Sequence, residues 1–498
     1  MSTVDGPRFA EDVLPSELWG ECWHYVDVKD IWNIRLVCKE FARTGKPFLY
    51  RVLYCWSPNQ EDVDDKNWDM WCKHFLWSAK RFVVVATGPF VYYVEEWSFS
   101  GIEQTRALND TNANIRGIGV LVEAYHSALT IFLNTLPLYP NLHTITLTTI
   151  KIDKDVFDAL NQMPKLGSLS LIETNTIVRP TLSSISPWHL KRLRIVNGDQ
   201  PGPLEDEHLS IVSPAALDTL VLHSYGFSEA CLRPLADAQE PLNVLTSLSL
   251  NLREDTLELL RDIVQLCPIL ETLEIYDFDF KDSKEIQYPP RSSFSNIPRL
   301  RFYHGPAYLA ARILAASPFE SLSLHTGRSR EHSYSFQEIY KLLRPLSHQI
   351  PIHLAFSVVK VDTRLFDVLA SIFYSVQSLA LCFDDPIHDD PVHDDRPNYR
   401  QVLLKNNPPF VWPVRPSNTL MGLLDHLVTQ ESSLPPSLIK LRFTQADPYA
   451  SRRITPQEQR QYLEKLSLRY QNLMSFQIGE NPPLVRSGYG RPWHEIGH

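Results

Sequence analysis

The 498-residue chain is poor in glycine and lacks the short motifs that mark several large classes of enzyme. Its 18 glycines form no Gly-rich turn between a strand and a helix, which phosphate- and dinucleotide-binding folds require. No Gly-x-Ser-x-Gly elbow and no Walker loop is present. The sequence therefore nominates no catalytic residue, and it predicts neither a cofactor nor an enzyme activity.

Long apolar runs and an excess of positive charge are also missing. No run reaches the roughly 18 apolar residues of a membrane-spanning helix, so no membrane association is expected. The formal net charge of −10 disfavours a nucleic-acid partner, because proteins that bind the phosphate backbone are usually basic. With 44% hydrophobic and 21% charged residues, the composition is that of a folded soluble protein.

The seven cysteines are scattered and include no Cys-x-x-Cys pair. Most of them stand in apolar stretches, which predicts buried, reduced thiols rather than disulfides. The N-terminus lacks a basic region followed by an apolar core, so no secretory signal is expected. These features predict a cytoplasmic or nuclear protein.

One phrase, Leu-x-x-Leu-x-Leu, recurs from about residue 140 onward. Six copies start 24 to 28 residues apart, at 142–147, 166–171, 190–195, 217–222, 245–250 and 270–275. Five further copies are more degenerate in sequence or spacing, at 298–303, 319–324, 376–381, 438–443 and 473–478. The alternating apolar residues of each copy predict a short strand with one buried face.

Amphipathic segments between the phrases predict helices. Ile152, Val156 and Leu160 recur at helical spacing before Pro164, which ends the pattern. Similar spacing predicts helices at 257–267, 308–316 and 365–373. The Thr-Pro-Gln-Glu sequence at 455–458 is a capping box with Pro in the first turn, so it predicts the start of the last helix.

A strand followed by a helix at this period resembles the leucine-rich repeat. The resemblance implies an α/β fold, an irregular solenoid of parallel strands with outer helices over residues 136–480. An insertion loop is expected near 384–417, where Pro, Asp and His accumulate, and a C-terminal tail at 481–498. Because strand–helix alternation alone also fits a doubly wound α/β sheet, that sheet remains the alternative fold.

The N-terminal residues carry a second pattern. Leu-Pro-x-Glu-Leu at 14–18 is followed by Asp-Ile at 30–31 and by Val-Cys-Lys-x-Phe at 37–41. The spacing of apolar residues predicts one helix over about 15–26 and a second that starts at Asp27 or Asp30 and continues through Phe41. Such a hairpin is too small to hold a stable core alone, so it should need a partner or the rest of the chain.

These residues resemble the F-box, the helical module by which receptors dock on the Skp-type adaptor of cullin-RING ubiquitin ligases, here over residues 9–55. The resemblance implies adaptor binding through Leu14, Pro15, Leu18, Ile31, Ile34, Val37 and Phe41. Cys22 and Trp23 depart from the family pattern, which more often has Ile and Leu at these places. An ordinary helical subdomain is the simpler alternative.

Residues 56–135 separate the F-box from the first clear repeat. They are expected to form an N-terminal cap and degenerate early repeats, because the open end of a solenoid must be covered. Within them the sequence predicts a helix around 68–76, a strand at 82–86 and another helix at 115–136.

The position between the last two apolar residues of each phrase should point away from the core. Its occupants are Thr146, Ser170, Arg194, Val221, Ser249, Glu274, Ser323, Ala380, Arg442 and Gln477. Arg194 and Glu274 are the charged members nearest the middle of the regular repeats, so they are the predicted target-binding residues. The alternative is that a target binds the 384–417 loop or the C-terminal tail.

One segment contains metal-ligand residue types. His and Asp alternate with short gaps over 388–395, but a duplicated acidic surface turn explains them more simply, and no metal site is predicted. Two short basic pairs, Arg328 with Arg330 and Arg452 with Arg453, are interpreted as solvated surface or as contacts for an acidic or phosphorylated partner.

The sequence thus predicts a non-catalytic substrate-recognition subunit of a Skp–cullin–F-box E3 ubiquitin ligase. The adaptor, and through it the cullin, would bind the F-box, and an unidentified target protein would bind the repeat surface. A protein-binding scaffold with the same docking residues but no role in ubiquitination is the main alternative. An enzyme with an incidental helical N-terminus is disfavoured by the missing motifs.

Overall fold

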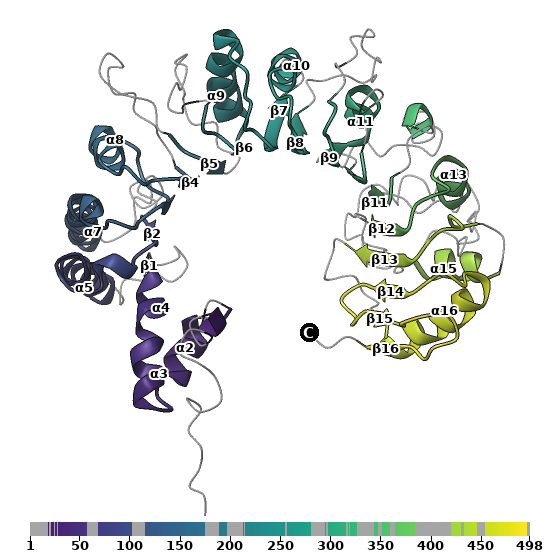
Figure 1. The fold of residues 1–498 in the computed structure, drawn as a ribbon, viewed down its shortest axis with the longest axis horizontal. Helices are drawn as coiled ribbons and strands as arrows, with labels where there is room; N and C mark the ends of the chain where they lie inside the picture. Colours follow the sequence, from purple (N-terminus) through teal and green to yellow (C-terminus); the bar gives the residue numbers. More distant parts are fainter. Residues whose placement is uncertain are drawn as a thin grey trace, which may run out of the picture. The chain divides into compact units, whose positions relative to one another are not determined.

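The computed structural model describes residues 18, 21–23, 25–26, 28–56, 68–101, 115–174, 189–196, 213, 215–253, 256–279, 294, 297–314, 317, 319–325, 343–346, 351–358, 364–383, 420–429, 433–445 and 454–495. It is a mixed α/β structure with mostly parallel strands. The chain divides into two units, Met1–Val244 and Leu245–His498. In each unit, the helices that follow β1 in the sequence lie on one side of the strands (Figure 1).

In the first unit, short helices precede the strands. The helices α2 (Val28–Ile34), α3 (Lys39–Thr44) and α4 (Lys46–Arg51) lead directly into β1 (Val52–Cys55). The later elements are α5 (Trp68–Thr87), η3 (Val91–Tyr93), β2 (Glu96–Ser100), α7 (Ile115–Thr135), η4 (Leu136–Leu138), β3 (Thr144–Thr148), α8 (Lys154–Asn161), β4 (Ser168–Ile172), β5 (Arg192–Val196), β6 (Thr219–His223) and α9 (Tyr225–Ala238).

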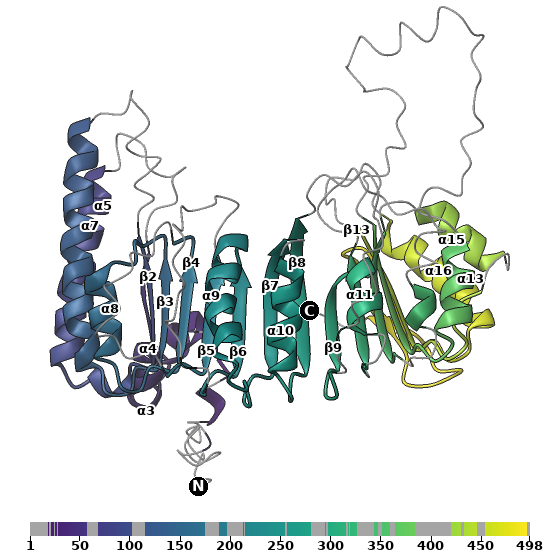
Figure 2. The ribbon, with the colours of Figure 1, turned by 90° about the horizontal axis from the view of Figure 1, so that it is seen from above.

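The strands β1 to β6 pair in the order of the sequence, and every one of these pairings is parallel (Figure 2). The register places equivalent phrase positions side by side, so that Phe99, Leu147, Leu171, Ile195 and Leu222 form one buried row. A doubly wound sheet reverses its strand order, so sequence-ordered pairing excludes that alternative within this unit.

Aromatic side chains build the core beneath the first strands. Phe82 on α5, Phe99 on β2 and Phe132 on α7 are fully buried, and the Phe99 and Phe132 ring centroids are 4.7 Å apart. Trp97 meets Phe82 edge to face at 4.8 Å. Such offset and perpendicular pairs add stability to the large apolar area that these rings bury.

The second unit repeats the arrangement with shorter helices. Its elements are β7 (Ser247–Arg253), α10 (Leu257–Gln265), β8 (Thr272–Asp279), β9 (Phe302–Pro306), α11 (Ala307–Ile313), β10 (Ser321–His325), η7 (Arg344–Leu346), β11 (His353–Val358), α13 (Arg364–Ile372), β12 (Ser378–Phe383), α15 (Leu420–Val428), β13 (Lys440–Gln445), α16 (Pro456–Arg469), β14 (Ser475–Ile478), β15 (Leu484–Val485) and β16 (His494–Glu495). The strands β7 to β14 pair in sequence order and in parallel.

The C-terminal end of this unit is antiparallel. The strand β15 pairs with β14, and β16 pairs with β15. Arg486 anchors the turnback, because its buried guanidinium donates to the carbonyls of Leu473 and Gln471 at 2.8 and 2.7 Å. These two strands lie within the predicted tail, where the sequence gave no sign of regular structure.

All eleven predicted phrases coincide with strands, β3 to β10 and β12 to β14. The six core positions Leu147, Leu171, Ile195, Leu222, Leu250 and Ile275 are all buried. The helices α8, α10, α11 and α13 lie where they were expected, and Thr455 and Glu458 form the capping box of α16. The strands β1, β2 and β11 were missed, because they carry no copy of the phrase.

Two local predictions are wrong. The predicted strand at 82–86 is part of α5, where Phe82, Val85 and Ala86 are buried but Val83 and Val84 are exposed, which is helical and not alternating periodicity. The second N-terminal helix is divided into α2 and α3. Cys38 caps α3, since its Sγ accepts a hydrogen bond from the Phe41 N–H at 3.3 Å.

Across the part of the chain that the structure describes, no helix combines the length and apolar character needed to cross a membrane.

Candidate binding surfaces

The N-terminal helical segment, residues 18–51 as far as they are described, has a very small core. Trp23, Ile31, Phe41 and Leu49 are its buried residues, and the Trp23 and Phe41 rings meet edge to face at 5.7 Å. Ile34 is partly buried against this core. Ile31 and Phe41, both predicted to bind the adaptor, therefore shape the segment from inside and do not present a surface.

Other apolar side chains of the same segment point into solvent. Leu18 and Val37, from the predicted set, are 48% and 72% exposed. Leu36 and Tyr25, which the sequence did not single out, are 79% and 88% exposed. Leu14 and Pro15 lie outside the described residues. Only the break between α2 and α3 turns Leu36 outward, so helical spacing could not have identified it.

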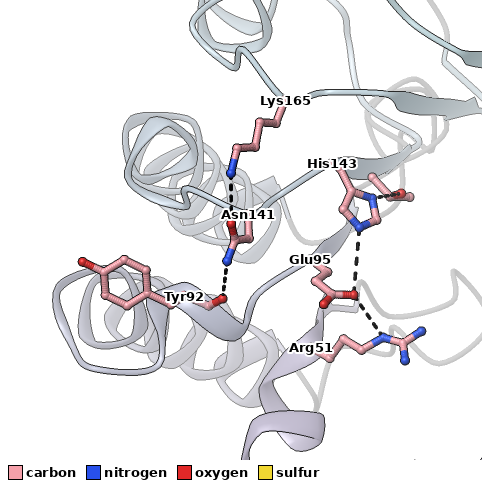
Figure 3. Close-up of polar contacts among 7 residues, drawn as sticks. Arg51, Tyr92, Glu95, Asn141, His143 and Lys165 are labelled. Atoms are coloured by element: carbon pink, nitrogen blue, oxygen red, sulfur yellow. Dashed lines mark hydrogen bonds and ion pairs between the residues drawn. The ribbon is translucent and has the colours of Figure 1, made fainter. Parts of the chain in front are cut away.

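Aromatic and polar contacts fix this helical segment to the first strands. The Tyr50 ring stacks on Phe90 with centroids 4.3 Å apart and planes 6° apart, and the Lys46 ammonium lies 4.5 Å from the centre of the same ring. The Arg51 guanidinium lies 3.4 Å from the Glu95 carboxylate, and the Arg51 carbonyl accepts the Glu95 N–H at 2.9 Å (Figure 3). The segment is therefore continuous with the sheet and firmly attached to it.

A polar network continues along the edge where strands β2 to β4 begin. The Glu95 carboxylate also lies 3.9 Å from His143 Nε2, so it stands between a guanidinium and an imidazole. Asn141 donates to the Tyr92 carbonyl at 2.7 Å and accepts from Lys165 Nζ at 3.1 Å (Figure 3). These groups satisfy one another and hold the loops in place, so we interpret the network as structural.

The outward face of the strands in the first unit is polar and carries positive charge at β5. The first two outward positions of β3, β4 and β6 hold Thr, Ser or Val, and the third holds Thr148, Ile172 or His223, whereas β5 presents Arg192 and Arg194. Arg194, a predicted target-binding residue, is exposed, and Arg192 is exposed beside it on the same strand face. The sequence analysis overlooked Arg192 because it considered only one position in each phrase.

In the second unit, the outward face carries hydrogen-bonded polar pairs. Ser249 on β7 donates to the carboxylate of Glu274 on β8 at 3.0 Å. His304 Nδ1 on β9 lies 2.7 Å from Ser323 Oγ on β10. Burial lowers the pKa of His304, and the nearby Glu274 charge partly opposes that shift. Glu274, the other predicted target-binding residue, is therefore half-buried and already engaged.

A serine beside a histidine and a carboxylate invites a comparison with nucleophilic catalysis, but the surroundings do not suit it. Acyl transfer needs N–H donors aimed at the developing oxyanion. The strands β8, β9 and β10 are joined by the parallel ladder, which engages their backbone N–H groups.

One motif escaped the sequence analysis. The last residues, His494-Glu-Ile-Gly-His498, match the His-Glu-x-x-His pattern, which binds zinc when a helix brings both histidines to one face. Here His494 and Glu495 form strand β16, and the Glu495 carboxylate pairs with Arg460 at 2.7 Å. His498 lies outside the described residues, so the motif does not have its zinc-binding conformation over the residues that are seen.

No group of three metal-ligating side chains occurs among the described residues. The His and Asp residues of 388–395 and the basic pairs Arg328, Arg330, Arg452 and Arg453 lie outside those residues. The seven cysteines are free thiols. Burial raises the pKa of Cys231 and of Cys267 to about 12, so both thiols are protonated and unreactive at neutral pH.

Comparison with known proteins adds no assignment: no protein-family model matches the chain, and no curated protein matches it.

Proposed function

We propose that this protein is the substrate-recognition subunit of a Skp–cullin–F-box ubiquitin ligase. The N-terminal helical segment acts as an F-box that binds a Skp-type adaptor, and the outward strand face binds a target protein. The protein itself performs no chemistry. It accelerates ubiquitin transfer by holding a lysine of the target near the thioester of the conjugating enzyme, which raises the effective concentration of that lysine.

The exposure of Leu36 and Val37, at 79% and 72%, carries this proposal. These two adjacent apolar side chains lie in the bend between α2 and α3 and are not among the residues that form the core of the segment. Buried apolar anchors supply most of the free energy of a protein interface. Together with Leu18 and Tyr25, these side chains provide such anchors on a segment whose sequence resembles an F-box.

The strands support the second half of the proposal. The strands β2 to β5 are parallel and pair in sequence order, which is the arrangement expected of the leucine-rich-repeat solenoid that the sequence resembles and supports this part of the proposal. Such arrays leave one strand face free of helices, and binding partners use that face. The contacts Tyr50–Phe90 and Arg51–Glu95 connect the proposed F-box to this array, as positioning of a target requires.

The decisive experiment is co-purification of the full chain with a Skp-type adaptor and a cullin. We expect both to be retained by the wild type. Changing Leu36 and Val37 together to Asp should reduce adaptor capture by at least about 30-fold, because even one buried interface anchor is worth about 2 kcal/mol or more. Both side chains are exposed, so the fold should be unaffected.

Leu468→Asp is the matched control, since Leu468 is an 82% exposed leucine on α16. Its adaptor binding should equal that of the wild type. Retention of the adaptor without the cullin would support the scaffold alternative, in which no ubiquitin is transferred. Equal adaptor capture by the double variant and by Leu468→Asp would remove the docking assignment.

A further inference from the structure

The strand β5 concentrates positive charge on the outward face of the first unit. Arg192 and Arg194 alternate with the buried Leu193 and Ile195, so both guanidinium groups project from the same side of the strand. Both side chains are exposed, and neither guanidinium is hydrogen-bonded or ion-paired to a residue that the structure describes. The chain as a whole carries a net charge of −10, so this pair is opposite in sign to the overall charge.

Among the described residues, no carboxylate is hydrogen-bonded or ion-paired to either guanidinium. Glu173, exposed at the end of β4, is the acid of the neighbouring strand, and its N–H donates to the Val196 carbonyl at 2.6 Å. On the neighbouring strands, the register partners of Arg192 are Ser168 and Thr219, and those of Arg194 are Ser170 and Val221. Exposed Lys191, Lys165 and His189 extend the basic character along the edge where the strand begins, while Asp218 is the acid at that edge. Glu96 lies three strands away, on β2, which is about 14 Å at the usual strand spacing of about 4.8 Å. That distance exceeds the Debye length at physiological salt, so the Glu96 charge is largely screened from the pair.

The spacing of the pair defines the kind of ligand. Residues two apart on a strand have Cα atoms about 6.8 Å apart, and the same distance separates alternate residues of an extended peptide. A guanidinium binds carboxylate or phosphate oxygens through two parallel hydrogen bonds, and such charge-assisted bonds are stronger than neutral ones. An extended peptide with acidic groups at alternate positions therefore matches β5 in both charge and spacing.

We propose that the outward face of β5 binds an extended acidic segment of a partner protein, in which Arg192 and Arg194 pair with anionic groups on alternate residues. The identification of this partner as the ubiquitination target rests on the proposed function. The chemistry of the site does not, because it depends only on the exposed guanidinium pair and its neighbours. Carboxylates of Asp or Glu and phosphates of phosphoserine offer the same oxygens.

The second unit supplies an internal control. On β13, Lys440 and Arg442 occupy the phrase positions of Arg192 and Arg194, and both are exposed. Lys440 carries a point charge without the planar fork of Arg, so this pair matches β5 in charge and in position but not in bidentate geometry. A ligand that responds only to positive charge should be affected equally by changes at either pair.

The test is fluorescence anisotropy with the full chain and labelled 12-residue Gly/Ala/Ser peptides. The first peptide has two phosphoserines at alternate positions, the second has two glutamates there, the third has two phosphoserines four residues apart, and the fourth has unmodified serines. We expect the first two to bind more tightly than the last two, with affinity falling as salt rises. If the first peptide binds more tightly than the second, phosphate is the preferred group. If the two bind equally, a carboxylate is sufficient.

The double variant Arg192→Glu/Arg194→Glu should weaken binding of the alternate-position peptides by at least about 30-fold, since two charge-assisted interactions are lost. Lys440→Glu/Arg442→Glu should weaken it by less than about 3-fold. Because all four side chains are exposed, urea midpoints should be unchanged, and any variant that unfolds is replaced by its Gln counterpart. Adaptor capture by both variants should equal that of the wild type.

Three results would overturn the β5 site. The first is equal binding of the peptides with alternate and with wider phosphoserine spacing, and the second is an equal loss of peptide affinity in the two double variants. The third is tighter binding of a single-stranded oligonucleotide than of the peptides. Peptide binding that depends on β5 in a protein that captures no adaptor would keep the site and remove the ligase proposal. Adaptor capture without peptide binding would keep the ligase proposal and remove the β5 site.

Discussion

The N-terminal helical segment and the strand–helix arrays use apolar side chains in different ways. In the helical segment, four residues are buried while Leu18, Tyr25, Leu36 and Val37 face solvent. In the arrays, the inward phrase positions are almost completely buried, and the outward positions are mostly Ser, Thr and charged residues. The first region leaves apolar area exposed, whereas the second presents polar groups.

This difference indicates two kinds of contact. An apolar surface binds mainly through the hydrophobic effect, which is roughly proportional to the area buried and tolerates salt. A polar strand face binds through hydrogen bonds and charge, which select a partner and weaken as salt rises. The receptor function that we propose, which would join an adaptor to a target, would use both kinds of contact.

Removing a buried ring from the strand–helix array should have the largest effect on stability. Phe132→Ala deletes a side chain that is fully buried against Phe82, Trp97 and Phe99. We expect a loss of about 3–5 kcal/mol in the free energy of unfolding, from lost burial and the cavity left behind. Urea denaturation measures it. A loss below about 1 kcal/mol would show that this aromatic core is loosely packed.

Ile31→Ala should cost less, about 2–3 kcal/mol, and the damage should stay within the helical segment, because Ile31 packs only in its small core. Hydrogen exchange should show lost protection in α2 to α4 while β3 and β4 remain protected. Leu36→Ala is the matched control, with an expected change within about 0.5 kcal/mol at an exposed site. Loss of protection throughout β1 to β6 would mean that the segment and the array unfold as one.

Gly305→Ala tests how tightly the second array is packed. A Cβ at Gly305 would lie 2.7 Å from Tyr303 Oη and 3.2 Å from Ile275 Cβ. Overpacking of this kind should cost about 1–3 kcal/mol. Adding Tyr303→Phe should recover part of the loss, because it removes the closest atom. Gly119→Ala on α7, where nothing lies within 4 Å, should instead be neutral or stabilising by up to about 1 kcal/mol.

The sequence anticipated those elements whose pattern is local and repeated. Each copy of the phrase became a strand because Leu at alternate positions needs a buried face, whatever the neighbours are. The strands β1, β2 and β11 escaped because Trp97, Phe99, Leu354 and Phe356 bury the same positions without that phrase. The segment 82–86 was misread because five consecutive apolar residues fit a strand as well as a helix, and only packing of α5 against α7 selects the helix.

The predicted site residues divide in the same way. Sequence placed Ile31 and Phe41 in helical structure, but on one helix where the structure has two, and it could not separate core from surface, since both kinds of residue belong to one apolar pattern. Arg194 stands exposed as expected, whereas Glu274 is half-buried and bonded to Ser249. The partners of a side chain on a strand face come from neighbouring strands, which are 20 to 30 residues away in the chain.

The sequence by itself determined the mixed α/β class, the positions of eleven strands and the polar character of their outward face. These properties follow from the period of hydrophobicity, which acts over a few residues. Only the tertiary structure decided that Leu36 and Val37 are exposed, that Cys38 separates α2 from α3, and that Arg192 joins Arg194 in one exposed pair. Burial and charge neutralisation depend on contacts between distant residues, and these exist only once the chain has folded.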